Sequence, residues 1–175
     1  MDKSCCSNSD IAADKSFETV KIEKTKNVCP MCEDFAAEQI KEQVPYAIIS
    51  CEGACLRGEV SRQAANLISF SIMPDKASRI CLGGAFTKDT GQRNLVRTAG
   101  RVIVLEGCFI ECASRMMKGI ISGLHPEVII VDRLYDFDRT LFGINQVTEQ
   151  QIKEFAQVVA SKIVQKITRE NSTEL

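Results

Sequence analysis

The sequence predicts an α/β fold: a three-layer open sandwich on a mainly parallel sheet of about four strands. Between residues 46 and 132, short apolar segments alternate with segments of helical periodicity, the order of a parallel sheet covered by helices on both faces. The apolar segments are nearly continuous, as expected for strands buried on both faces. The chain has 175 residues, 45% hydrophobic and 26% charged, so its length and composition are those of one globular domain.

The N-terminal part of the chain differs in character from the rest. We expect residues 1–28 to form a flexible tail with a weak edge strand over residues 17–26, and residues 29–175 to form one α/β domain. This domain begins with the CPMC segment, Cys29–Cys32, which leads a helix over residues 29–44. Two carboxylates in the first turn suit the positive end of the helix dipole, and a proline ends the helix.

The apolar patterns place the remaining elements. We expect strands over residues 46–51, 79–82, 101–105 and 127–132, and helices over residues 59–69, 89–98 and 109–118. The last helix has the best-defined start, because Thr148 and Gln151 form a capping box and apolar residues then recur on one face from Ile152 to Ile167. Before it, the aromatic and charged loop over residues 133–145 is expected either to cover the sheet edge as a lid or to pack as an apolar plug beneath this helix.

Four of the nine cysteines stand near the predicted carboxyl ends of strands. Cys51 ends the first strand, Cys81 lies at the end of the second, and Cys108 follows the third. Cys112 is one helical turn beyond Cys108, so both thiols can face the same way. In open α/β sheets the binding crevice lies outside the carboxyl ends of the strands. We therefore expect these four thiols to converge on the edge of the sheet where such folds bind ligands.

Thiols gathered in this way are typical of a metal or redox site. Four neighbouring thiolates repel one another unless a cation lies between them, and Zn²⁺ accepts tetrahedral sulfur ligation; an iron–sulfur cluster is a less common solution. An odd number of cysteines excludes a fully paired disulfide framework within the chain. Any one cysteine at a strand end is more often a core residue, so the prediction depends on the joint placement of the four.

Three cysteine blocks of this sequence resemble the DGC domain family, a family of zinc-binding proteins named for an Asp-Gly-Cys triplet. The blocks are LEGCFIECA over residues 105–113, CEGACLRG over residues 51–58, and CLGG over residues 81–84. They occur in the order typical of that family, and the likeness covers residues 48–132. The resemblance implies that the protein binds zinc through Cys51, Cys81, Cys108 and Cys112, and it implies no reaction.

The sequence departs from the family pattern at two positions. Glu106 stands where the family name has Asp, so a longer side chain takes a role next to the metal ligands. Cys55 stands where we expect Ser, so a fifth thiol could compete for the metal or exchange at it.

The CPMC segment has two alternative interpretations. Cys29 and Cys32 could form half of a zinc knuckle, but the other available thiols, Cys5 and Cys6, are adjacent and make poor partners on one ion. The same spacing at a helix N-terminus suits a redox dithiol.

A thiol–disulfide redox enzyme is therefore the alternative function. In it Cys108 or Cys51 attacks a disulfide, Cys112 or Cys55 resolves the intermediate, and the CPMC pair relays electrons. An iron–sulfur protein is the third candidate.

Several function classes are not supported by the sequence. A net charge of −1 argues against a nucleic-acid partner, and the longest apolar runs are too short to cross a membrane. The N-terminal residues do not resemble a signal peptide, so we expect a cytoplasmic protein. Dinucleotide, Walker and nucleophile-elbow motifs are missing, and the one histidine, His125, precedes a strand at the opposite edge from the cysteines. The sequence leaves open whether the protein is an enzyme and which partner it has besides a metal ion.

Overall fold

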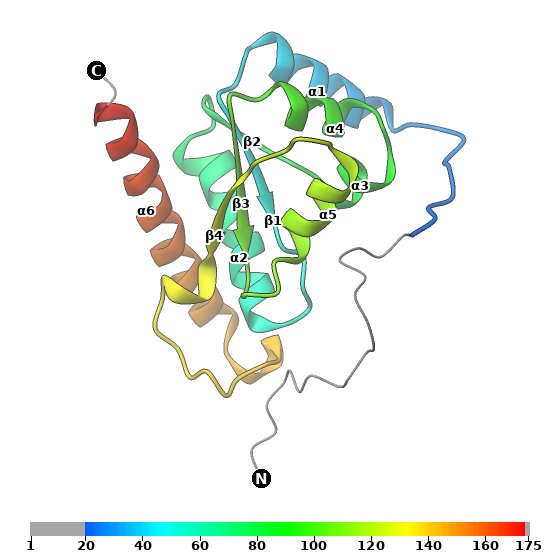
Figure 1. Cartoon of the computed structure of the whole chain (residues 1–175). Helices are drawn as coiled ribbons and strands as arrows, with labels where there is room; N and C mark the ends of the chain where they lie inside the picture. Colours follow the sequence, from blue (N-terminus) through cyan, green and yellow to red (C-terminus); the bar gives the residue numbers. More distant parts are fainter. Residues whose placement is uncertain (1–19, 174–175) are drawn as a thin grey trace.

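A parallel sheet forms the centre of the computed structural model, which describes residues 20–173. Its strands are β1 (Tyr46–Ser50), β2 (Ala77–Arg79), β3 (Arg101–Glu106) and β4 (Glu127–Ile130). They lie in the order β2-β1-β3-β4, and each neighbouring pair is parallel (Figure 1). The predicted α/β class and its parallel sheet are confirmed.

Helices cover both faces of the sheet (Figure 1). They are α1 (Pro30–Lys41), α2 (Leu56–Leu67), α3 (Leu82–Thr87), α4 (Gly91–Thr98), α5 (Cys112–Ile120) and α6 (Glu149–Thr173). One core joins α1, α3, α4 and α5 to Ile49 and Val104 of the sheet. The other joins α2 and α6 to Ile48 and Ile103. Successive residues of a strand point to opposite faces, so Ile48 and Ile49 belong to different cores and the three-layer arrangement follows.

One helix is absent from the sequence-based expectation. The Gly83–Gly84 pair is typical of a turn, but it lies inside α3. This helix begins directly after Cys81, whose Sγ accepts a hydrogen bond from the backbone N–H of Gly84 at 3.4 Å. The Cys81 sulfur, in the N-cap position, therefore stabilises α3, although the two glycines of this helix disfavour a helical backbone.

Three predicted boundaries also move. β2 ends at Arg79, so the strand expected over residues 79–82 is shorter and lies earlier in the chain. The helix expected over residues 109–118 begins only at Cys112, because Glu111 has a left-handed backbone with φ of 55°. The α2 segment starts at Leu56 rather than at residue 59 and continues as a π-helix over Ile68–Ile72.

The edge strand expected over residues 17–26 is not formed in its described part. Residues 20–26 pair with neither β2 nor β4, the two edges of the sheet, and Val20 and Ile22 are exposed. Residues 17–19, like Cys5 and Cys6, lie outside the described residues. The boundary between a tail and a domain at residue 29 stays a prediction.

The C-terminal helix begins as predicted. The N–H of Thr148 donates to Gln151 Oε1 at 2.9 Å, and the N–H of Gln151 donates to Thr148 Oγ1 at 3.2 Å. In the loop before α6, Tyr135 stacks on Phe137 and contacts Phe155 of α6, with ring centroids 4.6 and 4.9 Å apart. This part of the loop is thus the apolar plug. None of the helices in the described part of the chain is long and apolar enough to cross a membrane.

Candidate functional site

The cysteines of the sheet lie beyond the carboxyl ends of its strands, where helices begin. Cys51 directly follows β1, Cys81 precedes α3 as its N-cap, and Cys108 lies two residues beyond β3. Cys112 is the first residue of α5, and Cys55 is the N-cap of α2. Because the strands are parallel, these positions share one edge of the sheet, which we call the thiol edge.

Cys51 is the buried member of this group, with 8% of its surface exposed. Its N–H donates to the carbonyl of Leu105 at 2.8 Å, which extends the pairing of β1 with β3. Burial raises the pKa of the Cys51 thiol, and the N–H groups of Gly53 and Gly107 lower this pKa by donating hydrogen bonds to the sulfur. The thiol is therefore held in place by backbone donors from two loops.

The charge of Cys108 acts on Cys112, and the charge of Cys112 acts on Cys51. The pKa of Cys112 is raised first by burial and then by the negative charges of Glu106 and Cys108. The charge of Cys112 in turn contributes to the raised pKa of Cys51. The loop between β3 and α5 thus carries two predicted ligands, Cys108 and Cys112, and the charge of Cys112 reaches Cys51 after β1.

Glu106 connects the two ends of the loop between β3 and α5. It ends β3 with 1% of its surface exposed, and its carboxylate accepts the N–H of Ser114 at 2.6 Å and the N–H of Ala113 at 3.3 Å. These donors belong to the first turn of α5, where the helix dipole favours a negative charge. The sequence predicts that Glu106 acts next to the metal ligands. Its side chain connects the end of β3 to α5, the helix that begins with Cys112.

Glycines allow the loops of the thiol edge to meet backbone to backbone. A Cβ added to Gly58 would lie 2.5 Å from the carbonyl oxygen of Gly53, and one added to Gly107 would lie 2.9 Å from the backbone N of Gly58. A Cβ on Gly53 would lie 3.3 Å from Cys51 Sγ and 3.8 Å from Cys55 Sγ. The space between these two thiols is therefore open only because residue 53 has no side chain.

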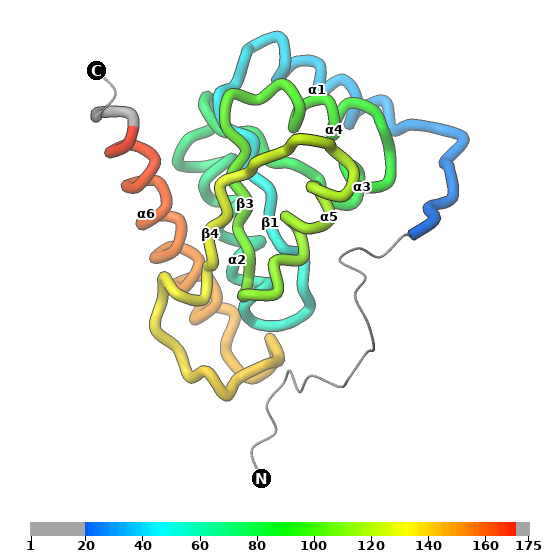
Figure 2. The backbone as a smooth tube through the Cα atoms, viewed as in Figure 1, coloured from blue at the N-terminus to red at the C-terminus, as the bar shows by residue number. Residues whose placement is uncertain are grey.

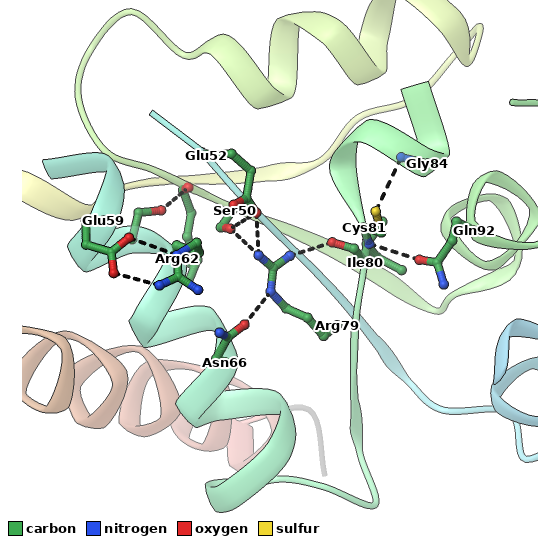
Figure 3. Close-up of polar contacts among 12 residues, drawn as sticks. Ser50, Glu52, Glu59, Arg62, Asn66, Arg79, Ile80, Cys81, Gly84 and Gln92 are labelled. Atoms are coloured by element: carbon green, nitrogen blue, oxygen red, sulfur yellow. Dashed lines mark hydrogen bonds and ion pairs between the residues drawn. The ribbon is translucent and has the colours of Figure 1, made fainter. Parts of the chain in front are cut away.

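Arg79 ties the ends of β1 and β2 together, a role that the sequence did not reveal (Figure 3). Its guanidinium donates to Ser50 Oγ and Glu52 Oε1, on either side of Cys51 in the chain, and to the carbonyl of Ile80. The side chain of Arg79 is 10% exposed, and its Nε donates to Asn66 of α2 at 3.0 Å. The Arg79 guanidinium therefore holds the residues on both sides of Cys51 and the residue before Cys81.

Gln92 is a second positioning residue missed from the sequence. Its buried Oε1 accepts the N–H of Cys81 at 2.9 Å, so α4 fixes the start of α3 (Figure 3). Both Arg79 and Gln92 act across elements that are far apart in the chain, and neither has a local pattern that would identify it.

The CPMC pair stands at the start of α1, with Cys29 as N-cap. The pKa of Cys29 is lowered, chiefly by the polar N–H and thiol groups of Cys32. The pKa of Cys32 is raised, because its thiol donates to Cys29 and because the charges of Cys29 and Cys81 oppose its ionisation. Cys81 is therefore a neighbour of the CPMC pair.

These opposite shifts predict an order of alkylation. Cys29 is exposed with a lowered pKa, so its reactive thiolate is populated at lower pH than that of Cys51, which is buried with a raised pKa. We expect limiting iodoacetamide at pH 7 to label Cys29 first and to leave Cys51 unlabelled until the pH is raised. Peptide mass spectrometry over time measures this order, and labelling of Cys51 before Cys29 would contradict it.

The loop between β4 and α6 also reaches the thiol edge (Figure 2). Cys55 forms a β-bridge with Gly143, and the N–H of Leu56 donates to the carbonyl of Phe142 at 2.8 Å. Arg57 donates to the carbonyl of Leu141 at 3.1 Å and lies 3.5 Å from the carboxylate of Asp132. The loop thus covers the start of α2 next to Cys55, so both a cover and a plug are present.

The four predicted zinc ligands lie at one edge of the sheet, but their side chains are not arranged around a common centre. Across the described residues, no three Cys, His, Asp or Glu side chains are arranged to hold a metal ion. The charges of Cys108 and Cys112 act within the chain of contacts that ends at Cys51, whereas the charge of Cys81 acts on Cys32.

Comparison with known proteins identifies one family. The family model described as the DGC domain matches residues 47–160, a segment that holds the four predicted ligands and ends within α6. The CPMC pair lies outside the matched segment. No curated protein and no solved structure matches the chain.

Proposed function

The chain belongs to the DGC domain family, and from this premise we propose that the protein binds a zinc ion through Cys51, Cys81, Cys108 and Cys112. The observation that supports this proposal is the placement of these cysteines at one sheet edge, where the charge of Cys112 acts on Cys51 and the charge of Cys108 acts on Cys112. Four thiolates held on strand and helix ends can supply the tetrahedral sulfur ligands of a closed zinc site.

The donor chemistry fits zinc. Thiolate sulfur suits Zn²⁺, and backbone N–H groups that donate to ligand sulfur orient it, as those of Gly53 and Gly107 do for Cys51. A zinc ion held by four thiolates supplies a cross-link between strand ends. Such thiols persist in a reducing cytoplasm, the compartment we propose.

Metal content per chain tests this proposal. We expect anaerobically purified protein to carry about one zinc per chain, the load of a single four-thiolate site. Cys108→Ser should lose the zinc, because serine does not replace a thiolate ligand. Cys29→Ser is the matched control and should keep it, because Cys29 lies outside the proposed ligand set. Zinc-free wild type, or zinc retained by Cys108→Ser, would refute the proposed site.

Thiol–disulfide chemistry is the second candidate function, and one observation favours it at the CPMC pair. Cys29 is exposed and has a lowered pKa, as expected of an attacking thiol. The pKa of Cys112 is raised, which suits a resolving thiol better than an attacking one. An iron–sulfur cluster is the third candidate, and visible absorbance of anaerobic protein would reveal it.

A further inference from the structure

The CPMC pair and Cys81 begin two helices that start close together. Cys29 and Cys32 stand at the start of α1, and Cys81 is the N-cap of α3. The charge of Cys81 acts on Cys32, and Lys88, at the end of α3, acts on both thiols of the pair. Three thiols and a cation therefore share this region, although they are distant in sequence.

Hydrogen bonds fix α1 relative to Cys81 through the first turn of α4. The carboxylate of Glu33 accepts the N–H of Gly91 at 2.8 Å, and Gln92 accepts the N–H of Cys81 at 2.9 Å. A Cβ on Gly91 would lie 2.9 Å from Ala36 Cβ, so α1 and α4 approach closely only because residue 91 is glycine. Gly91 and Gln92, which are consecutive residues of α4, thus bind Glu33 of α1 and Cys81. These contacts fix the CPMC segment relative to Cys81.

The pair has the arrangement of a reactive dithiol. Cys29 is exposed at the N-cap of a twelve-residue helix, and Cys32 follows it three residues later, which is the spacing of a redox dithiol. Cys32 is half-buried in the first turn of the same helix, so its thiol is the one that attacks the Cys29 sulfur once that sulfur has reacted.

We propose that Cys29–Cys32 is a redox site whose substrate is a disulfide, and that its oxidised form transfers the disulfide to Cys81 and so withdraws Cys81 from metal binding. The withdrawal rests on the proposed zinc site, whereas the disulfide transfer stands independently of it.

The steps balance in atoms and electrons. The Cys29 thiolate attacks the substrate disulfide, forming a mixed disulfide and releasing one substrate thiolate. The Cys32 thiolate then attacks Cys29 sulfur and releases the second, so the pair loses two electrons and two protons and the substrate gains them. The Cys81 thiolate next attacks Cys32 sulfur, forming Cys32–Cys81 and releasing Cys29 as a thiolate. This last step is an exchange without net oxidation.

Disulfide mapping tests the transfer. Oxidised glutathione is added to the reduced full chain without oxygen, free thiols are trapped by alkylation, and the protein is cleaved with trypsin. Cleavage at lysine and arginine places the CPMC pair on residues 27–41, Cys81 on residues 80–88, and Cys108 with Cys112 on residues 102–115. We expect the 27–41 peptide first with an internal disulfide and then linked to the 80–88 peptide. Linkage of 27–41 to 102–115 instead, or no oxidation of the pair, would overturn the proposal.

Zinc release supplies the second readout. In zinc-loaded wild type, a chromogenic chelator should register release as the link to residues 80–88 forms. Cys32→Ser should abolish both the link and the release, whereas Met31→Leu, which changes the exposed residue before Cys32 and keeps every thiol, should retain both. Equal release from Cys32→Ser and wild type would refute the control of metal binding. If the purified protein holds no zinc, the proposed function fails, yet the mapped disulfide still decides whether the relay exists.

Discussion

Gly58→Ala is expected to destabilise the protein by about 3 kcal/mol, because the new methyl group meets backbone and not a movable side chain. Its Cβ would lie 2.5 Å from the carbonyl oxygen and 2.7 Å from the Cα of Gly53. Relief requires α2 to move away from the loop that follows Cys51, and this movement would also disturb the contact between Gly58 and Gly107. We therefore expect weaker zinc binding together with the loss of stability.

Gly83→Ala is the matched control. A Cβ at residue 83 meets no atom within 4 Å, and this residue lies in α3, also beside the thiol edge. Alanine favours a helix over glycine, so the stability should rise or stay within about 1 kcal/mol of the wild-type value. Thermal unfolding of zinc-free protein measures both variants, with a fall of roughly 6–12 °C expected for Gly58→Ala. Equal melting temperatures would show that the loop accommodates a side chain at residue 58.

The main features of the fold could be predicted because they depend on local patterns. Near-continuous apolar segments gave the four parallel strands, and the capping box at Thr148 gave the start of α6. The common edge of the cysteines then followed from topology, because residues after parallel strands lie on one side of a sheet. The family resemblance is confirmed by the match over residues 47–160.

The contacts that position the site could not be predicted, because they join elements far apart in sequence. Arg79 binds Asn66 and Glu52 through its guanidinium, and no spacing rule reveals such a set. The proximity of Cys81 to Cys32 depends on how α1 packs on α4, which in turn depends on Gly91. The late start of α5 depends on the left-handed conformation of Glu111, which L-residues rarely adopt and which local pattern does not indicate.

Glu106→Ala is expected to cost about 2–4 kcal/mol of stability, because it removes a buried acceptor from two buried donors. The carboxylate holds the N–H groups of Ala113 and Ser114, and its own exposed fraction is 1%. Alanine leaves both donors without this partner and leaves a cavity beneath α5. Because α5 begins with Cys112, zinc affinity should fall as well. Glu106→Gln keeps one acceptor oxygen and the side-chain volume, so its loss of stability should be clearly smaller.

Chemical denaturation of zinc-free protein separates this structural role from metal binding. Both variants are compared with Glu38→Ala, which changes an exposed glutamate of α1 and should shift the free energy of unfolding by less than about 0.5 kcal/mol. A loss for Glu106→Ala that persists without zinc identifies Glu106 as the residue that anchors α5, and with it Cys112, to the end of β3. If the loss appeared only in zinc-loaded protein, the carboxylate would act on the metal site itself, and the anchoring role argued from its hydrogen bonds would be wrong.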